Sequence, residues 1–358
     1  MSGEHEAAVE SGAARSYPFQ FEGTGGEYFG IWIVNLALTV VTLGIYSAWA
    51  TVRTRRYFRG NMVLAGHAFD YHASPVRILI GRAIAFVLLL GYNISLNFSP
   101  YALLVWIPAF LIAVPWLIVS SLRFNARNTS YRNVRFNFTG TLGGAAKAYI
   151  FWPLIAMLSG GFLMPLARRV RDYYHINNHS FGGRPFETEF TGWQIYSRFL
   201  IAFAMWIALM VAFFTFIAVS AKFMPHGKAV SPNDIAIMAP LILMIAFLEI
   251  GFIVVGIATM AMIYNLALGH TVLDGRHRLR CRLNPLVLAW VVITNTLLTL
   301  ATLGLFYPWA QVRYTRYFLG RMALEATSDL DEFTSEAFGT QSAVGEEIAG
   351  FFDLGIGL

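Results

Sequence analysis

Charged side chains are scarce in this chain of 358 residues. Asp, Glu, Lys and Arg make up 13% of it, against about 25% in an ordinary soluble domain, and 57% of the residues are hydrophobic. A soluble protein of this size needs charge over its surface. Most of the outer surface therefore faces lipid, and we expect an integral membrane protein.

Cysteine is nearly absent as well, and Cys281 alone excludes an intrachain disulfide. No HExxH or CxxC zinc motif accompanies His175 and His179, so we expect no metal site. The sequence also lacks a Gly-rich phosphate loop and a serine nucleophile elbow. We expect no cofactor and no enzymatic activity.

The basic residues outnumber the acidic ones, 26 to 20. Such an excess can indicate nucleic-acid binding, but here the arginines flank long apolar segments, where topology signals are expected. We therefore expect no nucleic-acid partner. The first 28 residues lack a basic start followed by a short apolar run, so no cleaved signal peptide is expected.

Seven stretches are apolar and long enough to enter a bilayer, which takes about 20 residues. They cover approximately 29–50, 78–97, 101–121, 148–166, 199–221, 236–264 and 286–310. Three regions follow: a disordered lead over 1–17, a membrane domain over 18–324, and a disordered tail over 325–358. The tail has eight acidic residues and no Lys or Arg, which favours a solvated segment.

The two ends of the membrane domain repeat each other. Residues 35–62 align without gaps with 295–322, and 15 of 28 positions are identical. The identities include Asn, Thr, Trp, Arg and Tyr, which shared hydrophobicity cannot explain. A fainter copy places Gly161, Pro165, Ala167 and Tyr174 at the positions of Gly304, Pro308, Ala310 and Tyr317.

A second pattern lies between the apolar segments. Residues 61–75, 128–141 and 178–192 share an Asn, a Gly or Asn turn and an alternating strand that begins with Phe; 270–285 is a looser copy, and 19–24 resembles the closing strand. Alternation around such turns predicts short β-hairpins, which we place at the cytosolic membrane surface. Irregular loops that descend from an old duplication are the alternative. The predicted fold class is an all-α polytopic membrane protein with internal repeats and these hairpins.

Two topologies are open at this point. If all seven segments cross the bilayer, the basic residues divide 15 to 10 between its faces, with Arg82 inside a segment. If 29–50, 148–166 and 286–310 are re-entrant, only Lys222 and Lys228 lie on one face and 23 lie on the other. The second split fits the positive-inside rule far better. Breaks at 42–44, 159–161 and 302–304 suit re-entry, whereas a single crossing is the default for such lengths.

The segments IWIVNLALTVVTLGIYSAWATVRTRRYF and VVITNTLLTLATLGLFYPWAQVRYTRYF resemble the bacterial YjgN-like inner-membrane family, as do the interspersed N-x-x-x-x-G-x-x-F-x-F segments. The resemblance covers roughly residues 17–322. One departure is Ala48 where the second copy has Pro308. The resemblance implies a multi-pass protein of the bacterial inner membrane, and it carries no catalytic or binding residues with it.

Glu249 is the only acidic residue deep inside an apolar segment. An ionised carboxylate there costs several kcal/mol unless it is paired, protonated or hydrated. It is a candidate for proton or ion coupling, and the alternative is a protonated or paired residue that fixes helix packing. Two helix faces with polar residues could line a solute path or form interhelical hydrogen bonds. These residues are Asn35, Thr39, Thr42, Asn295, Thr299 and Thr302.

Arginines and aromatic residues follow each copy of the repeat where an apolar segment meets the surface. They are Trp49, Arg53, Arg56, Tyr57, Trp309, Arg313, Arg316 and Tyr317. Such belts anchor proteins to headgroups, so anionic lipid headgroups are the expected partners besides the bilayer itself; a specific anion site is the alternative. Two functions remain open: a transporter or permeation protein for a small solute or lipid, or a non-transporting scaffold or regulator that recruits partners at the cytosolic face.

Overall fold

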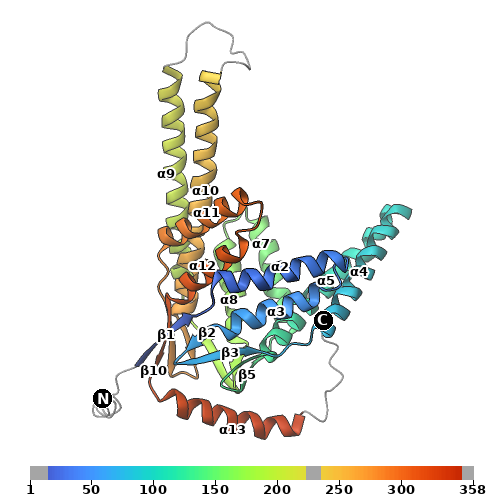
Figure 1. The fold of residues 1–358 in the computed structure, drawn as a ribbon. Helices are drawn as coiled ribbons and strands as arrows, with labels where there is room; N and C mark the ends of the chain where they lie inside the picture. Colours follow the sequence, from blue (N-terminus) through green and yellow to red (C-terminus); the bar gives the residue numbers. More distant parts are fainter. Residues whose placement is uncertain (1–14, 223–234, 349–358) are drawn as a thin grey trace.

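The computed structural model describes residues 15–222 and 235–348, and its centre is a closed antiparallel barrel of ten short strands (Figure 1). Around the barrel the strands follow the order β1-β10-β9-β8-β7-β6-β5-β4-β3-β2. They are β1 (Arg15–Phe21), β2 (Met62–Leu64), β3 (His67–Tyr71), β4 (Thr129–Tyr131), β5 (Val134–Phe138), β6 (His179–Phe181), β7 (Arg184–Thr188), β8 (Thr271–Leu273), β9 (His277–Cys281) and β10 (Met322–Ala326).

Four hairpins supply eight of these strands, and they lie in the stretches that the sequence pattern indicated. The β4–β5 hairpin turns through Arg132 and Asn133, with φ of 49° and 64°. The β6–β7 hairpin turns through Gly182 and Gly183, with φ of 54° and 85°. Positive φ at both central residues gives the turn whose twist matches that of the flanking strands, and Gly and Asn adopt it most readily.

The prediction of an all-α fold is wrong, because the hairpins do not stay separate at the membrane surface. They pair edge to edge, and β1 closes the ring against β10 with Tyr17 opposite Leu324. Closure removes every exposed strand edge, which stabilises strands that are each too short to persist alone.

Helix pairs connect the strands, so the order strand, helix pair, strand recurs five times. Two pairs are long: α4 (Pro75–Phe98) with α5 (Leu103–Arg127), and α9 (Gly192–Lys222) with α10 (Ile235–Gly269). A 3₁₀ turn, Pro100–Ala102, joins the first two. Three pairs are short: α2 (Gly25–Val41) with α3 (Ser47–Gly60), α6 (Leu142–Ala146) and α7 (Trp152–Leu158) with α8 (Met164–Asn177), and α11 (Pro285–Ala301) with α12 (Tyr307–Leu319). A π-helical turn, Lys147–Phe151, joins α6 to α7.

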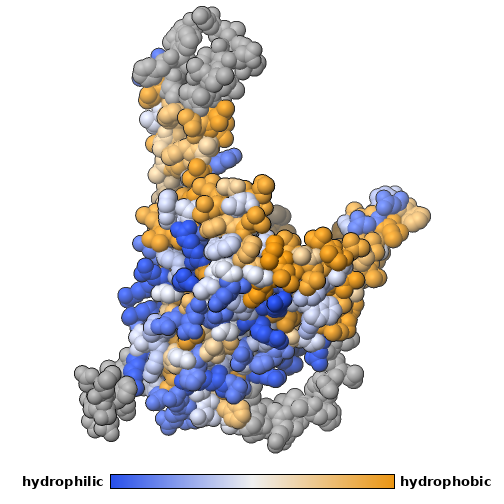
Figure 2. All heavy atoms as spheres, in the orientation of Figure 1, coloured by the Kyte–Doolittle hydropathy of each residue, from blue (hydrophilic) through white to orange (hydrophobic). Residues whose placement is uncertain are grey.

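Four helices are long and apolar enough to cross a membrane: Pro75–Phe98, Pro100–Arg127, Gly192–Val219 and Ile242–Gly269. They belong to the two long pairs. In Figure 1 these pairs leave the barrel in different directions, and Figure 2 shows apolar side chains along both of them, with polar side chains gathered over the barrel.

Each short pair reverses at the break that the sequence indicated. In the first pair Leu43 has φ of 50° and the Gly44 amide donates to the Thr39 carbonyl oxygen at 2.8 Å. The turn at Leu303 and Gly304 has the same geometry, with φ of 50° and 94°. A left-handed residue followed by this backward hydrogen bond is the Schellman motif, which ends a helix.

The turns of the short pairs expose apolar side chains. Leu43 and Leu303 are each 94% exposed, and Phe162 beside the third turn is 78% exposed. All ten strands belong to one barrel, so both ends of every helix pair lie at the barrel. Segments 29–50, 148–166 and 286–310 therefore each turn back toward the barrel; their re-entry into the bilayer stays a prediction.

The tail differs from the disordered segment expected over 325–358. Residues 325 and 326 end β10, and Leu330–Ile348 forms helix α13. Ion pairs between acidic residues of α13 and arginines of the barrel, described below, compensate the negative charge on which the prediction of disorder rested. At the other end, β1 already begins at Arg15, inside the expected lead over 1–17. Residues 1–14 and 349–358 lie outside the described part of the chain.

Candidate functional site

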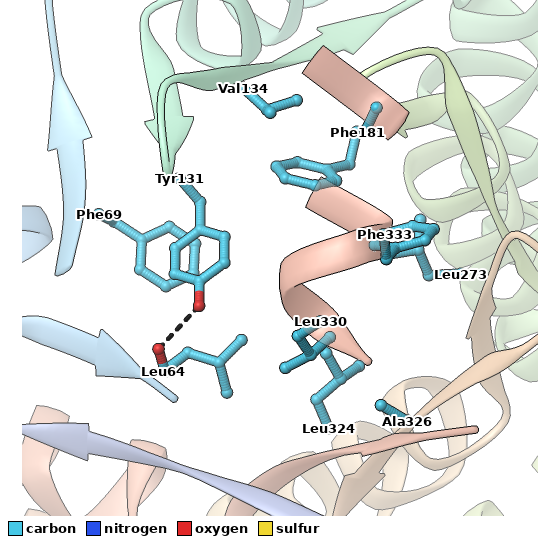
Figure 3. Close-up of a cluster of buried hydrophobic side chains, with 11 residues drawn as sticks. Leu64, Phe69, Tyr131, Val134, Phe181, Leu273, Leu324, Ala326, Leu330 and Phe333 are labelled. Carbon is cyan, nitrogen blue, oxygen red and sulfur yellow. Dashed lines mark hydrogen bonds between the residues drawn. The ribbon is translucent and has the colours of Figure 1, made fainter. Parts of the chain in front are cut away.

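The lumen of the barrel is filled by side chains from alternate strand positions. Phe19, Phe69, Phe136 and Phe186 form one layer, in which neighbouring rings stack with centroids 6.4, 6.3 and 6.3 Å apart. The second strand of each unit adds a further layer, made up of Leu64, Tyr131, Phe181, Leu273 and Leu324. The Tyr131 hydroxyl donates to the Leu64 carbonyl oxygen at 2.8 Å (Figure 3). Packing of this kind makes the barrel a solid core.

Helix α13 crosses the barrel at the end away from the long helix pairs (Figure 1). Leu330, Phe333 and Ala337 recur at helical spacing, are buried, and join the aromatic core (Figure 3). The Phe333 ring stacks on Phe181 at 6.3 Å and meets His277 edge-on at 4.4 Å. This end of the barrel, with its hairpin turns and α13, is called the barrel mouth below.

Opposite charges hold α13 at the barrel mouth. Arg132, in the β4–β5 turn, pairs with Asp331. Arg184, at the start of β7, pairs with Glu336 at 3.3 Å and with Asp274 at 3.0 Å. The Arg132 side chain is 14% exposed, whereas that of Asp331 is 78% exposed, so this ion pair lies at the edge of the contact with solvent on the helix side. Solvent weakens such pairs, so they contribute modestly to the docking of α13.

Three nitrogens at the barrel mouth are buried without a hydrogen-bond partner. They are Nε of Arg132, Nε of Arg184 and Nδ1 of His277, from three successive hairpins. Burial lowers the pKa of His277, and nearby Arg276 lowers it further, while Asp274 opposes both. Buried polar groups normally have a hydrogen-bond partner, and α13 supplies none to these three atoms.

A groove of about 670 Å³ runs along one side of α13. The barrel contributes His67, Arg132 and Asn133, and the helix contributes Asp331, Thr334, Ser335 and Phe338. Phe338, at the edge of this groove, is 52% exposed. The barrel mouth therefore combines an apolar floor, a basic rim and open space.

The polar residues of the first and last helix pairs lie within the pairs. Thr39 donates to the Asn35 carbonyl oxygen at 2.6 Å, and Thr42 donates to Leu38 at 2.7 Å. In the last pair Thr299 and Thr302 repeat these bonds at 2.7 and 2.8 Å. Each hydroxyl has thereby used its one donor on its own helix backbone, and the hydroxyls of Thr42 and Thr302 also accept from the amides of Tyr46 and Phe306.

The two asparagines of these faces differ. Asn295 donates to the Ala310 carbonyl oxygen at 3.0 Å and accepts from Arg313 at 3.1 Å, which joins α11 to α12. Asn35 is equally buried, but its side-chain amide has no hydrogen-bond partner, and Arg53 is exposed.

The expected anchoring residues fall into two groups. Arg53 and Arg56 are exposed, whereas the hydroxyl of Tyr57 donates to the Thr24 carbonyl oxygen at 2.8 Å. Tyr317 binds the Asn284 carbonyl oxygen at 3.0 Å.

Other members of this group contact neighbouring helices. Arg316 donates to the Gly23 carbonyl oxygen at 2.8 Å, and Trp309 packs on Phe29 at 4.9 Å, so α12 is held against the first unit. Trp49 is half-buried and stacks on Tyr46 at 6.2 Å.

Glu249 lies on the exposed face of α10. Its candidate role in ion coupling stays a prediction. Within the described residues no cluster of three or more His, Cys, Asp or Glu side chains could hold a metal ion.

Sequence reasoning missed the barrel mouth. Arg132, Arg184 and His277 each occupy an ordinary turn or strand start, so nothing in the local sequence distinguishes them. The spacing of Leu330, Phe333 and Ala337 within an acidic segment was the available signal, since it predicts one apolar helix face.

Two long helix pairs, whose four helices are apolar and long enough to cross a membrane, three short apolar pairs and a barrel covered by α13 define a multi-pass membrane protein. The chain belongs to the family described as bacterial protein of unknown function (DUF898), which matches residues 16–351.

Curated relatives support the same assignment. The inner membrane protein YjgN of Salmonella typhimurium is 31% identical over 161 residues, which is 42% of this chain and 38% of the relative. The protein of the same name from Escherichia coli O157:H7 is 28% identical over 169 residues, 46% of this chain and 41% of the relative. The chain thus spans about two fifths of the length of the curated relatives it matches.

The resemblance seen in the repeated segments is thereby confirmed, as is the placement in the bacterial inner membrane. No solved structure matches the chain.

Proposed function

We propose that this protein is a non-transporting, non-enzymatic membrane scaffold whose barrel recruits partners at the cytosolic face. The observation that carries the proposal is the filled barrel lumen, with stacked phenylalanines in one layer and α13 across the mouth. A transporter needs a polar path, and neither the barrel lumen nor the paired threonines provide one.

The membrane helices support the same proposal. The apolar windows of α4 and α9 have no buried residues, and those of α5 and α10 have few. In Figure 1 the two long pairs diverge, so a solute path between them would need further protein. The long pairs serve instead as anchors, and the three short pairs add apolar tips in the leaflet next to the barrel.

Charge supports a cytosolic orientation of the barrel. If every helix pair returns to the barrel's side of the bilayer, 23 of the 26 basic residues fall on that side, Arg82 falls inside a segment, and Lys222 falls on the other side together with Lys228, which lies outside the described residues. Under the positive-inside rule, this division favours a barrel in the cytosol. The recurrence of strand, helix pair and strand also supports an origin by internal repetition, with five units rather than two.

Orientation is testable by topology reporters near residues 175 and 275, which belong to two different units. We expect both to report the cytosol and a reporter at residue 99, between α4 and α5, to report the periplasm. Reporters at 175 and 275 that both face the periplasm would overturn the cytosolic assignment.

Transport is tested in liposomes that contain the full chain. We expect no flux of a panel of ions, small solutes and fluorescent lipids above that of empty liposomes. The Glu249→Gln variant serves as the discriminating control, because it keeps the shape of the side chain but cannot ionise. Flux that the wild type supports and Glu249→Gln abolishes would replace the scaffold proposal with a transporter.

A further inference from the structure

The barrel mouth has the composition of a peptide-binding site. Its apolar floor accepts Leu330, Phe333 and Ala337, and its rim carries Arg132 and Arg184. An amphipathic helix in an apolar groove, with charges at the edge, is a common mode of recognition between proteins. In this structure the protein's own C-terminal helix occupies the site.

The fit between α13 and the barrel mouth is incomplete. The Nε–H groups of Arg132 and Arg184 have no acceptor on α13, and Nδ1 of the fully buried His277 has no hydrogen-bond partner there. The groove beside the helix leaves further volume, lined by His67 and Asn133. A helix with more acidic or amide groups along this edge would satisfy the rim better.

The connection of α13 to the barrel is short. Only residues 327–329 separate β10 from the helix. A short connection keeps α13 at high effective concentration, so that a weak contact still keeps the site closed.

We propose that the barrel mouth is the docking site for an acidic amphipathic helix of a partner protein, and that α13 occupies this site until the partner displaces it. The inference rests on the proposed scaffold function and names the chemistry of its partner. The partner helix carries apolar residues at spacings of three and four, as in Leu330, Phe333 and Ala337, with carboxylates flanking that stripe.

The first experiment uses a labelled peptide of residues 327–348 as the probe. It is added to purified full-length wild type, to Ala337→Lys, and to Phe333→Lys, whose charge likewise cannot be buried in the barrel core. Ala337 is fully buried against the barrel, so a lysine there expels α13. We expect the two opened forms to bind the peptide at least tenfold more tightly than the wild type does.

The role of charge is measured by peptide binding to further variants made in a form whose α13 has been expelled. Arg132→Gln with Arg184→Gln should weaken peptide binding at least fivefold, and a peptide with Asp331→Asn and Glu336→Gln should bind weakly to the unaltered mouth. Arg53→Gln with Arg56→Gln is the matched control, because it removes two exposed arginines away from the mouth. Opened forms that do not bind the peptide, or equal binding by the wild type, would overturn the docking site.

The second experiment tests the partner in cells by crosslinking from residue 133, at the rim. We expect an adduct that increases in Ala337→Lys and that the co-expressed peptide of residues 327–348 suppresses. Peptide binding without such an adduct would leave α13 as the sole occupant and refute the partner. The liposome assay does not depend on either binding result. Failure of the proposed scaffold function can therefore be told apart from failure of the docking site.

Discussion

The hydroxyl of Tyr174 donates a hydrogen bond of 2.9 Å to the carbonyl oxygen of Thr141, and so ties α8 to the residue that caps α6. Tyr57 makes the same bond to Thr24, and Tyr317 makes it to Asn284. Each tyrosine precedes the next strand by the same number of residues. The bond therefore closes the base of all three short helix pairs and identifies the third pair as a unit of the same kind.

Loss of this bond should destabilise each short pair. We expect Tyr57→Phe, Tyr174→Phe and Tyr317→Phe each to lower the free energy of unfolding by about 1 kcal/mol, the net value of a typical hydrogen bond. Thermal unfolding in detergent measures the change. Tyr101→Phe is the control, since Tyr101 is 76% exposed. Equal effects of all four variants would show that the bond has no special role.

The tips of the short pairs should lie in hydrocarbon. A cysteine with an environment-sensitive fluorophore at position 43 or 303, in a Cys281→Ser background, should emit at shorter wavelength than one at exposed position 329. Lipids with quenchers on their acyl chains should quench the first two only. Identical emission from positions 43 and 329 would contradict insertion.

Local features of this fold could be predicted because each depends on neighbouring residues. The breaks at 42–44, 159–161 and 302–304 follow from Thr or Ser and Gly within apolar runs, and the hairpins follow from Gly and Asn turns between alternating strands. The barrel could not be predicted in the same way. Strands of three to seven residues carry little pattern, and the closing contact pairs Tyr17 with Leu324, at opposite ends of the chain.

The candidate site shows the same limit. Eight acidic residues without a basic one favour disorder when residues 325–358 are considered alone. Their counter-charges, Arg132 and Arg184, lie about 200 and 150 residues away in sequence, and only the closed barrel brings them to α13. Glu249 illustrates the reverse case: its place in an apolar run was evident, whereas its exposure on α10 depends on the packing of α9.

Acid should weaken the docking of α13. With α13 docked, burial lowers the pKa of His277 below its ordinary value of about 6.5, to which release would return it. The released state therefore binds more protons, so docking is fully stable above pH 6.5 and weakens as the pH falls below it. The groups that face His277 are Asp274, Arg276, Ser328 and Phe333.

Limited proteolysis of α13 between pH 8 and pH 5 measures this dependence. Cleavage should accelerate on acidification in the wild type, after correction for the protease's own pH profile on the free peptide. His277→Leu keeps an apolar contact with Phe333 and removes the titration, so its cleavage should change less over the same range. A slope that His277→Leu leaves intact would assign the pH response to other groups.

Gly182 gives the sharpest test of how closely α13 approaches the hairpins. A Cβ at this position would lie 2.6 Å from the Cβ of Ala337 and 2.7 Å from Cγ1 of Val134, and φ there is +54°. Gly275 is the matched control, because it has φ of +65° in a neighbouring turn and nothing within 4 Å of an added Cβ. Both alanine variants bear the backbone strain of about 1 kcal/mol for a left-handed residue, but only Gly182→Ala also collides with α13. We therefore expect Gly182→Ala to expose α13 to proteolysis and to admit the peptide of residues 327–348, whereas Gly275→Ala retains a closed mouth. Equal behaviour of the two variants would mean that α13 does not rest against the β6–β7 turn in solution.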